Sequence, residues 1–370
     1  MVDLRSDTVT QPTDGMRAAM AAAVVGDDGF DEDPTAQALQ RDVATLFGRQ
    51  AALFMPSCTM ANLAGLMALL NRGDELICAT TAELVTHAHG ALAAIGGISA
   101  RTGQAVNGLL DARTVTSLLG RSEFYTNPTA AIAVEQTANR VGGLVYPLDE
   151  LIALHGVATA AGIPLICDGA RIWNAHTATG VPLTQYGRLF NVISVSLAKG
   201  LGAPMGGLVI GSTDVVQRAR KIRKQLGGAM RQAGIMAAAA RYALEHHLPR
   251  LHDDHRRAAV LAAALTPYGV ADPAQVHTNM LVLELRGTTW KAGEFVAAAA
   301  TQGVLCCALS ADQVRLVTHL NVTDDLLGQA IDVIVGLLRH REPGRPFRRG
   351  RPHQHRVFPE PARSLHAGSS

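Results

Sequence analysis

Short apolar runs alternate along the chain with longer segments in which apolar residues recur at helical spacing. Before residue 250 the apolar runs read AALFMPS, DELICAT, TAAIAVEQ, IPLICDGARIW, NVISVSLAKG and GGLVIGS. Such runs are typical of strands buried on both faces of a parallel sheet. IPLICDGARIW predicts a strand followed by a loop. Helical spacing occurs between several of them, at TAQALQRDVATLFG, CTMANLAGLMALL, AELVTHAHGALAAIGG and LDELIALHGVATAAG. The alternation predicts an α/β domain over residues 35–250, with a mostly parallel central sheet flanked by helices.

The pattern differs at both ends of the chain. Beyond residue 250, helical and strand-like segments predict a smaller α+β domain over residues 251–340, at HDDHRRAAVLAAAL, TNMLVLEL, KAGEFVAAAATQG, VRLVTHL and DLLGQAIDVIVGLLRHR. Residues 1–34 are polar and turn-rich, which predicts an N-terminal arm with a loop at GDDGFDEDP. Residues 341–370 are rich in Pro, Arg, Gly and His and lack periodicity, so a disordered tail is predicted.

Charge and cysteine content narrow the class of protein. The formal net charge is +2, with +5 on residues 341–370 and −3 on the rest. Because a basic disordered end is usually just solvated, no nucleic-acid partner is expected. No apolar run of roughly 18 residues lacks charges, Gly and Pro, and MVDLRSDTVTQP has no signal-peptide core, so no membrane contact is predicted. The five cysteines lack metal-ligand spacing, which predicts buried thiols in a reducing cytoplasm and no metal.

Two apolar runs end in residues that suit anions or cations of a ligand. Ser57, Cys58 and Thr59 follow AALFMP and open a helical segment, where free N–H groups and hydroxyls suit a phosphate. The same residues also suit an ordinary helix cap. Asp168 closes the run IPLICD, and a buried acid there needs a partner. That partner is either Arg171 in a structural ion pair or a cationic ring nitrogen.

Two other runs carry a cation. Lys199 follows VISVSLA, and its ammonium must reach solvent, pair with an anion or be consumed as a Schiff base. The glycines that follow would let a bulky ligand approach the backbone. Arg315 lies in VRLVTHL, where a guanidinium suits a bidentate carboxylate or a salt bridge. Taken together, the four run ends provide what pyridoxal 5'-phosphate (PLP) bound to an amino acid requires.

The motifs around these residues resemble those of the low-specificity L-threonine aldolases. VDLRSDTVTQPT, GDDGFDEDPT, PSCTMANL, ICDGARIWNA, SVSLAKGLGAP, GGAMRQAG and RLVTHLNV occur in the order of that family, over about residues 2–340. The resemblance implies PLP fold type I, the aspartate-aminotransferase fold, with a large PLP-binding domain and a smaller C-terminal α+β domain. It also implies homodimers or homotetramers whose active sites are shared between subunits.

The resemblance further implies a role for each matching residue. Lys199 would form a Schiff base with the cofactor, and Asp168 would face the cofactor's ring nitrogen. The phosphate would be held by Thr59, the backbone of Cys58 and, from a neighbouring subunit, Arg231. The carboxylate of a small amino-acid substrate would be held by Ser6, Arg315 and Arg171, the last of which also belongs to the cofactor-binding set.

The sequence departs from the family pattern at several of these sites. Cys58 replaces a glycine where the backbone would meet the phosphate, and Glu83 stands where the family stacks a histidine on the ring. Phe30 replaces a tyrosine of the acidic loop, and Ala138 replaces a histidine in the motif read here as EQTAN. A further histidine aligns loosely with Tyr125. These changes alter the residues expected to line the substrate pocket.

The departures leave the base for cleavage open. Retro-aldol cleavage requires a group that takes the proton of the β-hydroxyl. That group could be Glu83, if burial raises its pKa toward neutrality. It could also be His87, one helical turn further on, or a held water molecule. His87 and His89 equally suit a solvated helix face.

These observations predict a PLP-dependent aldehyde-lyase. It would cleave a β-hydroxy-α-amino acid of the L-threonine or L-allo-threonine type to glycine and an aldehyde. A different PLP reaction on the same scaffold is the alternative, such as racemisation, β-elimination or glycine transfer to a new aldehyde. A PLP-binding protein without catalysis is a third reading, although an intact carboxylate clamp argues against it. Replacing Glu83 by histidine would discriminate, because it should raise turnover if the family chemistry survives.

Overall fold

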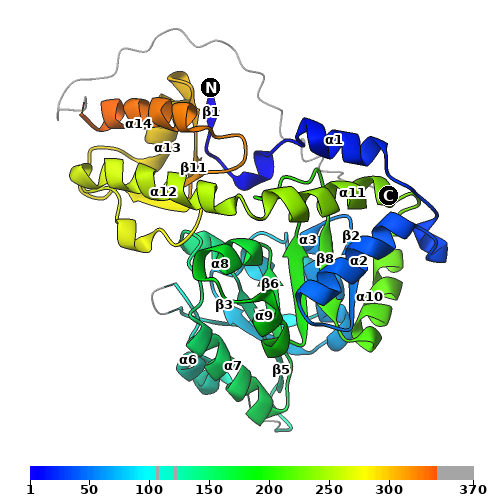
Figure 1. Ribbon diagram of the computed structural model, residues 1–370. Helices are drawn as coiled ribbons and strands as arrows, with labels where there is room; N and C mark the ends of the chain where they lie inside the picture. Colours follow the sequence, from blue (N-terminus) through cyan, green and yellow to red (C-terminus); the bar gives the residue numbers. More distant parts are fainter. Residues whose placement is uncertain (106–107, 121–122, 340–370) are drawn as a thin grey trace, which may run out of the picture.

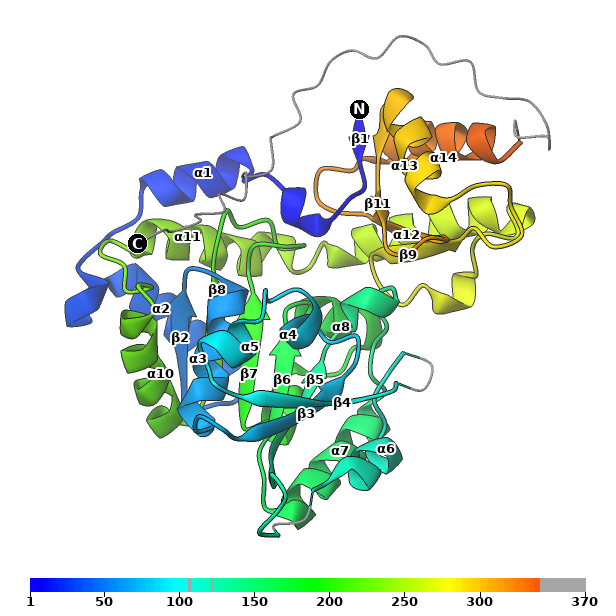
Figure 2. The ribbon, with the colours of Figure 1, turned by 180° about the vertical axis from the view of Figure 1, so that it is seen from behind.

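The protein is described by a computed structural model that covers residues 1–105, 108–120 and 123–339 (Figures 1 and 2). The tail predicted over residues 341–370 lies outside this part. A seven-stranded sheet in the order β2-β8-β7-β6-β5-β3-β4 forms the body. Its strands are β2 (Ala51–Met55), β3 (Glu75–Ala79), β4 (Ser99–Gly103), β5 (Thr129–Glu135), β6 (Leu165–Gly169), β7 (Val192–Ser196) and β8 (Gly207–Gly211). Strands β4, β3, β5, β6 and β7 are parallel, and β8 runs antiparallel between β7 and β2.

The predicted burial of the strands on both faces is confirmed. Along β5, Ile132 and Val134 pack into one hydrophobic core while Ala131 and Ala133 pack into another. Alternate side chains of a strand point to opposite faces, so each face needs its own cover of helices. One face carries α3 (Cys58–Leu69), α4 (Glu83–Thr86), α5 (Ala91–Ala94) and α10 (Thr213–Gln225) (Figure 2). The other carries α2 (Pro34–Leu46), α7 (Leu148–Ala161), α8 (Ile172–Thr179) and α9 (Leu183–Leu189), with α6 (Ala112–Leu118) beside α7 (Figure 1).

A second, smaller core follows the large sheet. It lies around an antiparallel sheet in the order β11-β12-β9, formed by β9 (Met280–Glu284), β11 (Cys307–Ala308) and β12 (Gln313–Val317). Its helices are α12 (Leu251–Leu265), α13 (Ala292–Thr301) and α14 (Asp324–Arg339). The N-terminal strand β1 (Val2–Asp3) pairs with β10 (Val304–Leu305), so the arm joins this smaller core. The division of the chain at residues 34, 250 and 340 stays a prediction.

The structure corrects the local predictions in three places. The segment AELVTHAHGALAAIGG forms two short helices rather than one, because His89 and Gly90 adopt φ values of 47° and 72°. The arm contains a regular helix, α1 (Asp14–Ala21), whose cap is the side chain of Thr13. Strand β6 is followed by a helix that begins at Ile172, where the sequence predicted a loop. For α1 and for the helix after β6, the apolar spacing was too short or too polar to place the element.

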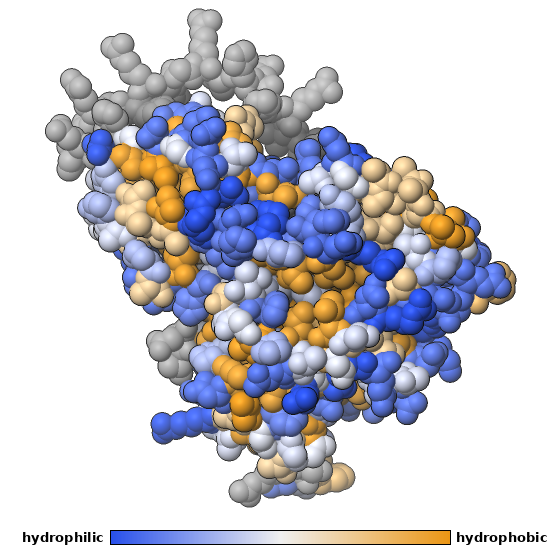
Figure 3. Space-filling view, in the orientation of Figure 1, coloured by the Kyte–Doolittle hydropathy of each residue, from blue (hydrophilic) through white to orange (hydrophobic). Residues whose placement is uncertain are grey.

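The surface has an apolar groove of about 730 Å³ where α1, α2 and α11 (Gly234–Tyr242) meet. Its apolar lining includes Ala19, Ala22, Ala23, Val24, Leu46 and Ala238. Apolar residues gather in this region on the face that Figure 3 shows. In the described part of the chain, no helix has the length and apolar character needed to cross a membrane.

Candidate active site

The candidate site lies where the parallel strands of the large sheet reach their carboxyl ends. Glu135 at the end of β5 stands beside Asp168 of β6 in the sheet register, and Lys199 follows β7 by three residues. The N-terminus of α3 follows β2, which runs in the same direction as β7. Because the carboxyl ends of parallel strands meet at one edge, these groups converge on the position where α/β proteins bind ligands.

Asp168 is a buried carboxylate that neutral groups hold in place. Its Oδ2 accepts a hydrogen bond from Asn62 Nδ2 at 2.7 Å, and its Oδ1 accepts one from the N–H of Ala170 at 3.1 Å. Burial raises its pKa, and the nearby charge of Lys199 offsets part of that rise. No ion pair to Asp168 exists among the described residues, so pairing with Arg171, one of the two predicted arrangements, is wrong. A buried acid without a cation fits the protonated ring nitrogen of PLP.

Arg171 pairs instead with Asp7 of the N-terminal arm. Its Nε and Nη2 donate to the two oxygens of Asp7 at 2.8 and 2.6 Å, and both side chains are buried. Burial alone would raise the pKa of Asp7, but the charge and hydrogen bonds of Arg171 hold it well below its usual range. Asn279 donates a further hydrogen bond to Asp7 at 3.4 Å, and Thr10 Oγ1 donates to the carbonyl of Lys199 at 3.1 Å. The arm therefore holds both Arg171 and the loop of the lysine.

Arg315 on β12 lies close to Arg171 and shares its electrostatic environment. Its Nη1 donates to Asn139 Oδ1 at 2.7 Å, and its Nη2 donates to the carbonyl of Arg5 at 3.1 Å. Within the described part of the chain, its buried Nε has no hydrogen-bond partner. Burial and the charge of Arg171 both lower the pKa of Arg315. Asp7 offers one negative charge to two neighbouring guanidinium groups, which leaves one positive charge to neutralise and fits a substrate carboxylate. Ser6 follows Arg5, whose carbonyl accepts the hydrogen bond from Arg315.

The start of α3 is exposed at Thr59. Ser57 caps the helix by accepting a hydrogen bond from the N–H of Met60 at 3.1 Å. Opposite it, a Cβ on Gly207 would lie 2.8 Å from Cα of Cys58, so β8 approaches the helix start more closely than any other residue type would allow. The thiol of Cys58 stays neutral, because burial raises its pKa to about 12. The exposed start at Thr59 fits the phosphate of PLP, and Cys58 adds no charge against it.

Glu83 and His87 lie on and just after α4, on the α3 side of the sheet. The carboxylate of Glu83 is 3.6 Å from Nδ1 of His87, and Glu83 lines a small cavity together with Thr59 and Asn62. His87 is exposed, does not line that cavity, and has Thr86 Oγ1 2.8 Å from its Nδ1. Glu83 therefore faces this cavity, whereas His87 does not line it.

The remaining predicted positions lie outside this cluster of contacts. Arg231 is exposed and pairs with Asp27 of the acidic loop at 3.1 Å, and no contact in the described chain joins it to Asp168 or Lys199. Phe30 and Tyr125 are exposed, at 75% and 91% of their surface. Ala138 is buried next to the Asn139 that contacts Arg315. The role of Arg231 in a neighbouring subunit stays a prediction.

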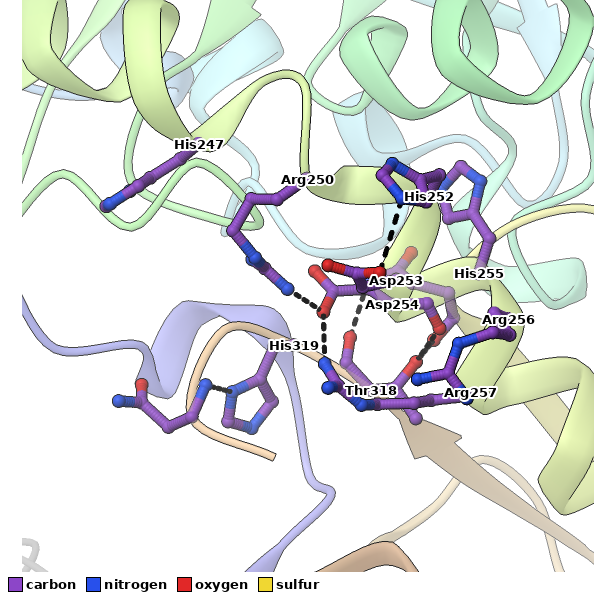
Figure 4. Close-up of polar contacts among 12 residues, drawn as sticks. His247, Arg250, His252, Asp253, Asp254, His255, Arg256, Arg257, Thr318 and His319 are labelled. Atoms are coloured by element: carbon purple, nitrogen blue, oxygen red, sulfur yellow. Dashed lines mark hydrogen bonds and ion pairs between the residues drawn. The ribbon is translucent and has the colours of Figure 1, made fainter. Parts of the chain in front are cut away.

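A separate polar cluster at the start of α12 fixes the strand that carries Arg315 (Figure 4). The buried Asp254 pairs with Arg250 and lies 3.8 Å from Arg257, and its backbone carbonyl accepts a hydrogen bond from Thr318 Oγ1 at 2.6 Å. One residue further, His319 Nε2 lies 2.7 Å from the carbonyl of Asp3. These contacts tie the end of β12 to α12 and to the arm. No group of metal-ligating side chains occurs in the part of the chain that the structure covers.

Sequence reasoning missed four residues of the site: Asp7, Asn62, Glu135 and Asn139. Glu135 carried a usable signal, because it is an acid that closes the apolar run TAAIAVE, as Asp168 closes IPLICD. The contacts of Asp7 with Arg171 and of the Asn139 side chain with Arg315 join segments far apart in the chain.

Comparison with known proteins places this geometry in context. A family model described as beta-eliminating lyase matches residues 3–288. The low-specificity L-threonine aldolase of Escherichia coli is 38% identical over 331 residues, which cover 89% of this chain and 97% of that protein. A solved threonine aldolase of Leishmania major has a TM-score of 0.78 at 20% identity and covers 91% of this chain and 100% of its own. A solved structure of SPT with PLP has a TM-score of 0.70 at 14% identity, covering 90% and 86%.

The structural likenesses confirm the predicted fold class, PLP fold type I. The sequence likeness carries the family assignment, because it extends over most of both chains. The chain belongs to the beta-eliminating lyase family, within the group of the low-specificity L-threonine aldolases.

Proposed function

We propose that this protein is a PLP-dependent aldehyde-lyase that cleaves a β-hydroxy-α-amino acid such as L-threonine to glycine and an aldehyde. The observation that carries the proposal is the convergence of Lys199, Asp168 and two arginines at one edge of the sheet, in a chain 38% identical to a threonine aldolase. When bound, PLP supplies a protonated ring that accepts the electron pair of the bond being broken. The alternative PLP reactions have no separate support.

The residues of this chain would hold the cofactor from three sides. Lys199 would bind its aldehyde, Asp168 its ring nitrogen, and the first turn of α3 at Cys58 and Thr59 its phosphate. Arg231 would reach the phosphate of a neighbouring subunit, which agrees with its exposed position. The thiol of Cys58 is compatible with a phosphate at this position. Its raised pKa keeps it uncharged, so it adds no negative charge beside the phosphate.

The two arginines would set the pose of the substrate. Arg171 bonds Asp7 through Nε and Nη2, so its Nη1 can donate to a substrate. The unpartnered Nε of Arg315 can donate as well. A substrate carboxylate would be held between them, with Ser6 beside it. Once the carboxylate is fixed, the direction of the Cα–Cβ bond is what remains to be set. Cleavage requires that bond to stand perpendicular to the cofactor ring, and a rigid clamp supplies that orientation in advance.

Glu83 is our candidate for the group that takes the β-hydroxyl proton. It lines the cavity next to Thr59 and Asn62, and its carboxylate is backed by His87 at 3.6 Å. A proton accepted at the carboxylate could pass to His87 and then to solvent, because His87 is exposed. His87 would thus assist Glu83 rather than replace it.

We further propose that the protein works in the cytoplasm as a homo-oligomer, a dimer or a tetramer. All five cysteines are free thiols, as expected in a reducing compartment. The apolar groove between α1, α2 and α11 offers a surface for a second copy. Sedimentation velocity of the PLP-loaded protein measures the oligomeric state, and a monomer would contradict the shared site.

The first test is proton NMR of the PLP-loaded protein with L-threonine in D2O. We expect the threonine signals to be replaced by those of glycine and acetaldehyde. Loss of the Cα proton signal without cleavage would refute aldolase action on threonine and indicate a racemase or a related reaction. If the spectrum does not change, L-allo-threonine and bulkier β-hydroxy amino acids are tested next, and inertness toward all of them overturns the proposal.

A further inference from the structure

We propose that Glu135 is a positioning residue that holds the candidate base and the carboxylate clamp in register by capping two helical segments at once. The inference rests on the proposed aldolase function and adds to it a residue with no assigned role. Glu135 is the last residue of β5 and is 9% exposed. Its two carboxylate oxygens point to two different segments of the site.

One oxygen caps the helix of the base. Oε2 of Glu135 accepts a hydrogen bond from the N–H of Glu83, the first residue of α4, at 3.1 Å. The residue before it, Ala82, provides no side-chain cap. A four-residue helix has few hydrogen bonds of its own, so an acceptor at its first N–H largely decides where it begins. Glu135 thereby fixes the backbone from which the Glu83 side chain enters the cavity.

The other oxygen caps the segment of the clamp. Oε1 of Glu135 accepts a hydrogen bond from the N–H of Asn139 at 3.2 Å, where the 3-10 helix Asn139–Val141 begins. Ala138, the preceding residue, again has no side-chain cap. Oδ1 of the same Asn139 accepts the 2.7 Å hydrogen bond from Arg315. A single carboxylate thus links Glu83 and Arg315, two groups with different tasks in the proposed reaction.

The two hydrogen bonds of Glu135 predict separable effects on kcat and KM. In E135Q one oxygen becomes an NH2 group that faces a backbone N–H, so one cap is lost and the other is weakened. We expect kcat for L-threonine to fall and KM to rise, each by about tenfold, because a buried backbone N–H that loses its acceptor no longer holds its segment in place. N139A removes only the contact to Arg315 and should raise KM by several-fold with kcat nearly unchanged. E83Q should lower kcat and leave KM within a few-fold.

A rescue variant tests the mechanism more sharply. Ala82 has the extended backbone of an N-cap residue, with φ −60° and ψ 140°, so serine there can cap α4 itself. The double variant E135Q/A82S should recover most of the loss in kcat and none of the rise in KM. A residue that merely stabilised the fold would lower the melting temperature without separating the two constants in this way.

The matched control is E75Q. Glu75 is also 9% exposed and lies in the same sheet, but at the start of β3, where it pairs with Arg101 at 2.8 Å. It should lose stability and keep kcat and KM. Amide hydrogen exchange gives a readout independent of turnover: E135Q should speed exchange at the N–H groups of Glu83 and Asn139, and E75Q should not.

The outcomes separate this inference from the proposed function. If the wild-type protein cleaves no β-hydroxy amino acid, the proposed function fails, while hydrogen exchange still decides whether Glu135 caps both segments. The inference is overturned if E135Q matches E75Q in kcat, KM and exchange. If E135Q does not fold, N139A decides, because Asn139 is only half-buried; an unchanged KM in N139A would overturn the link to Arg315.

Discussion

Two sets of residues face each other in the candidate site, and they are built differently. The strand-end set consists of Asp168, Arg171 and Lys199. Asn62 donates a hydrogen bond to Asp168, and Arg171 donates to Asp7. The α4 set consists of Glu83 and His87, on a four-residue helix with no side-chain cap of its own. Asp168 and Arg171 are buried, whereas His87 is exposed and Glu83 half-buried.

The difference indicates which part of the chemistry each set controls. The strand-end set would provide what the proposed PLP chemistry needs, and its buried contacts leave little freedom for change. The α4 set would decide which bond breaks, and it contains the departure from the family pattern at Glu83. A sparsely bonded segment tolerates substitution better than a buried network, because fewer partners are left unsatisfied.

Replacing Lys199 probes the strand-end set and has the largest expected effect. K199A removes the amine proposed to bind the cofactor's aldehyde, so kcat for L-threonine should fall by at least about 10³-fold. The visible absorbance band of the lysine-bound cofactor should disappear. Steady-state kinetics and an absorbance spectrum measure both effects. The control K291A changes an exposed lysine paired with Asp312 and should leave both unchanged. Activity above a tenth of wild type in K199A would contradict the assignment.

Replacing Glu83 probes the α4 set and should have the next largest effect. E83Q keeps the size of the side chain but cannot accept the β-hydroxyl proton, so kcat should fall by about 10²–10³-fold with KM little changed. E83H supplies a base again and should restore or raise turnover. H87A should lose less than tenfold, because His87 stands behind Glu83. If H87A loses more than E83Q, His87 is the base and the order of the two is reversed.

The comparison also explains what the sequence could predict. Asp168 and Lys199 were predicted because each closes a long apolar run, and the carboxyl ends of such runs converge in any parallel sheet. The partner of Arg171 could not be predicted from local spacing, since Asp7 lies 164 residues earlier in the chain. The break after α4 depends on positive φ at His89, a residue type that gives little warning of that conformation.

The smallest expected effect concerns pH and the apoprotein. Burial, and then the negative charge of Asp168, raise the pKa of Glu135 to about 8, above its ordinary value of 4.5. A carboxyl whose pKa is raised by folding contributes stability that is complete below its unfolded pKa and is lost as the pH rises through its folded pKa. The free energy of unfolding of the apoprotein should therefore fall by about 1 kcal/mol from pH 7 to pH 8. The buried His255, with a pKa lowered to about 4, is already neutral in that range.

Urea unfolding at the two pH values measures the change, which E135Q should abolish and the control E75Q should retain. Equal pH dependence in wild type and E135Q would show that Glu135 does not hold a proton at neutral pH, and its double cap would then be formed by the ionised carboxylate throughout.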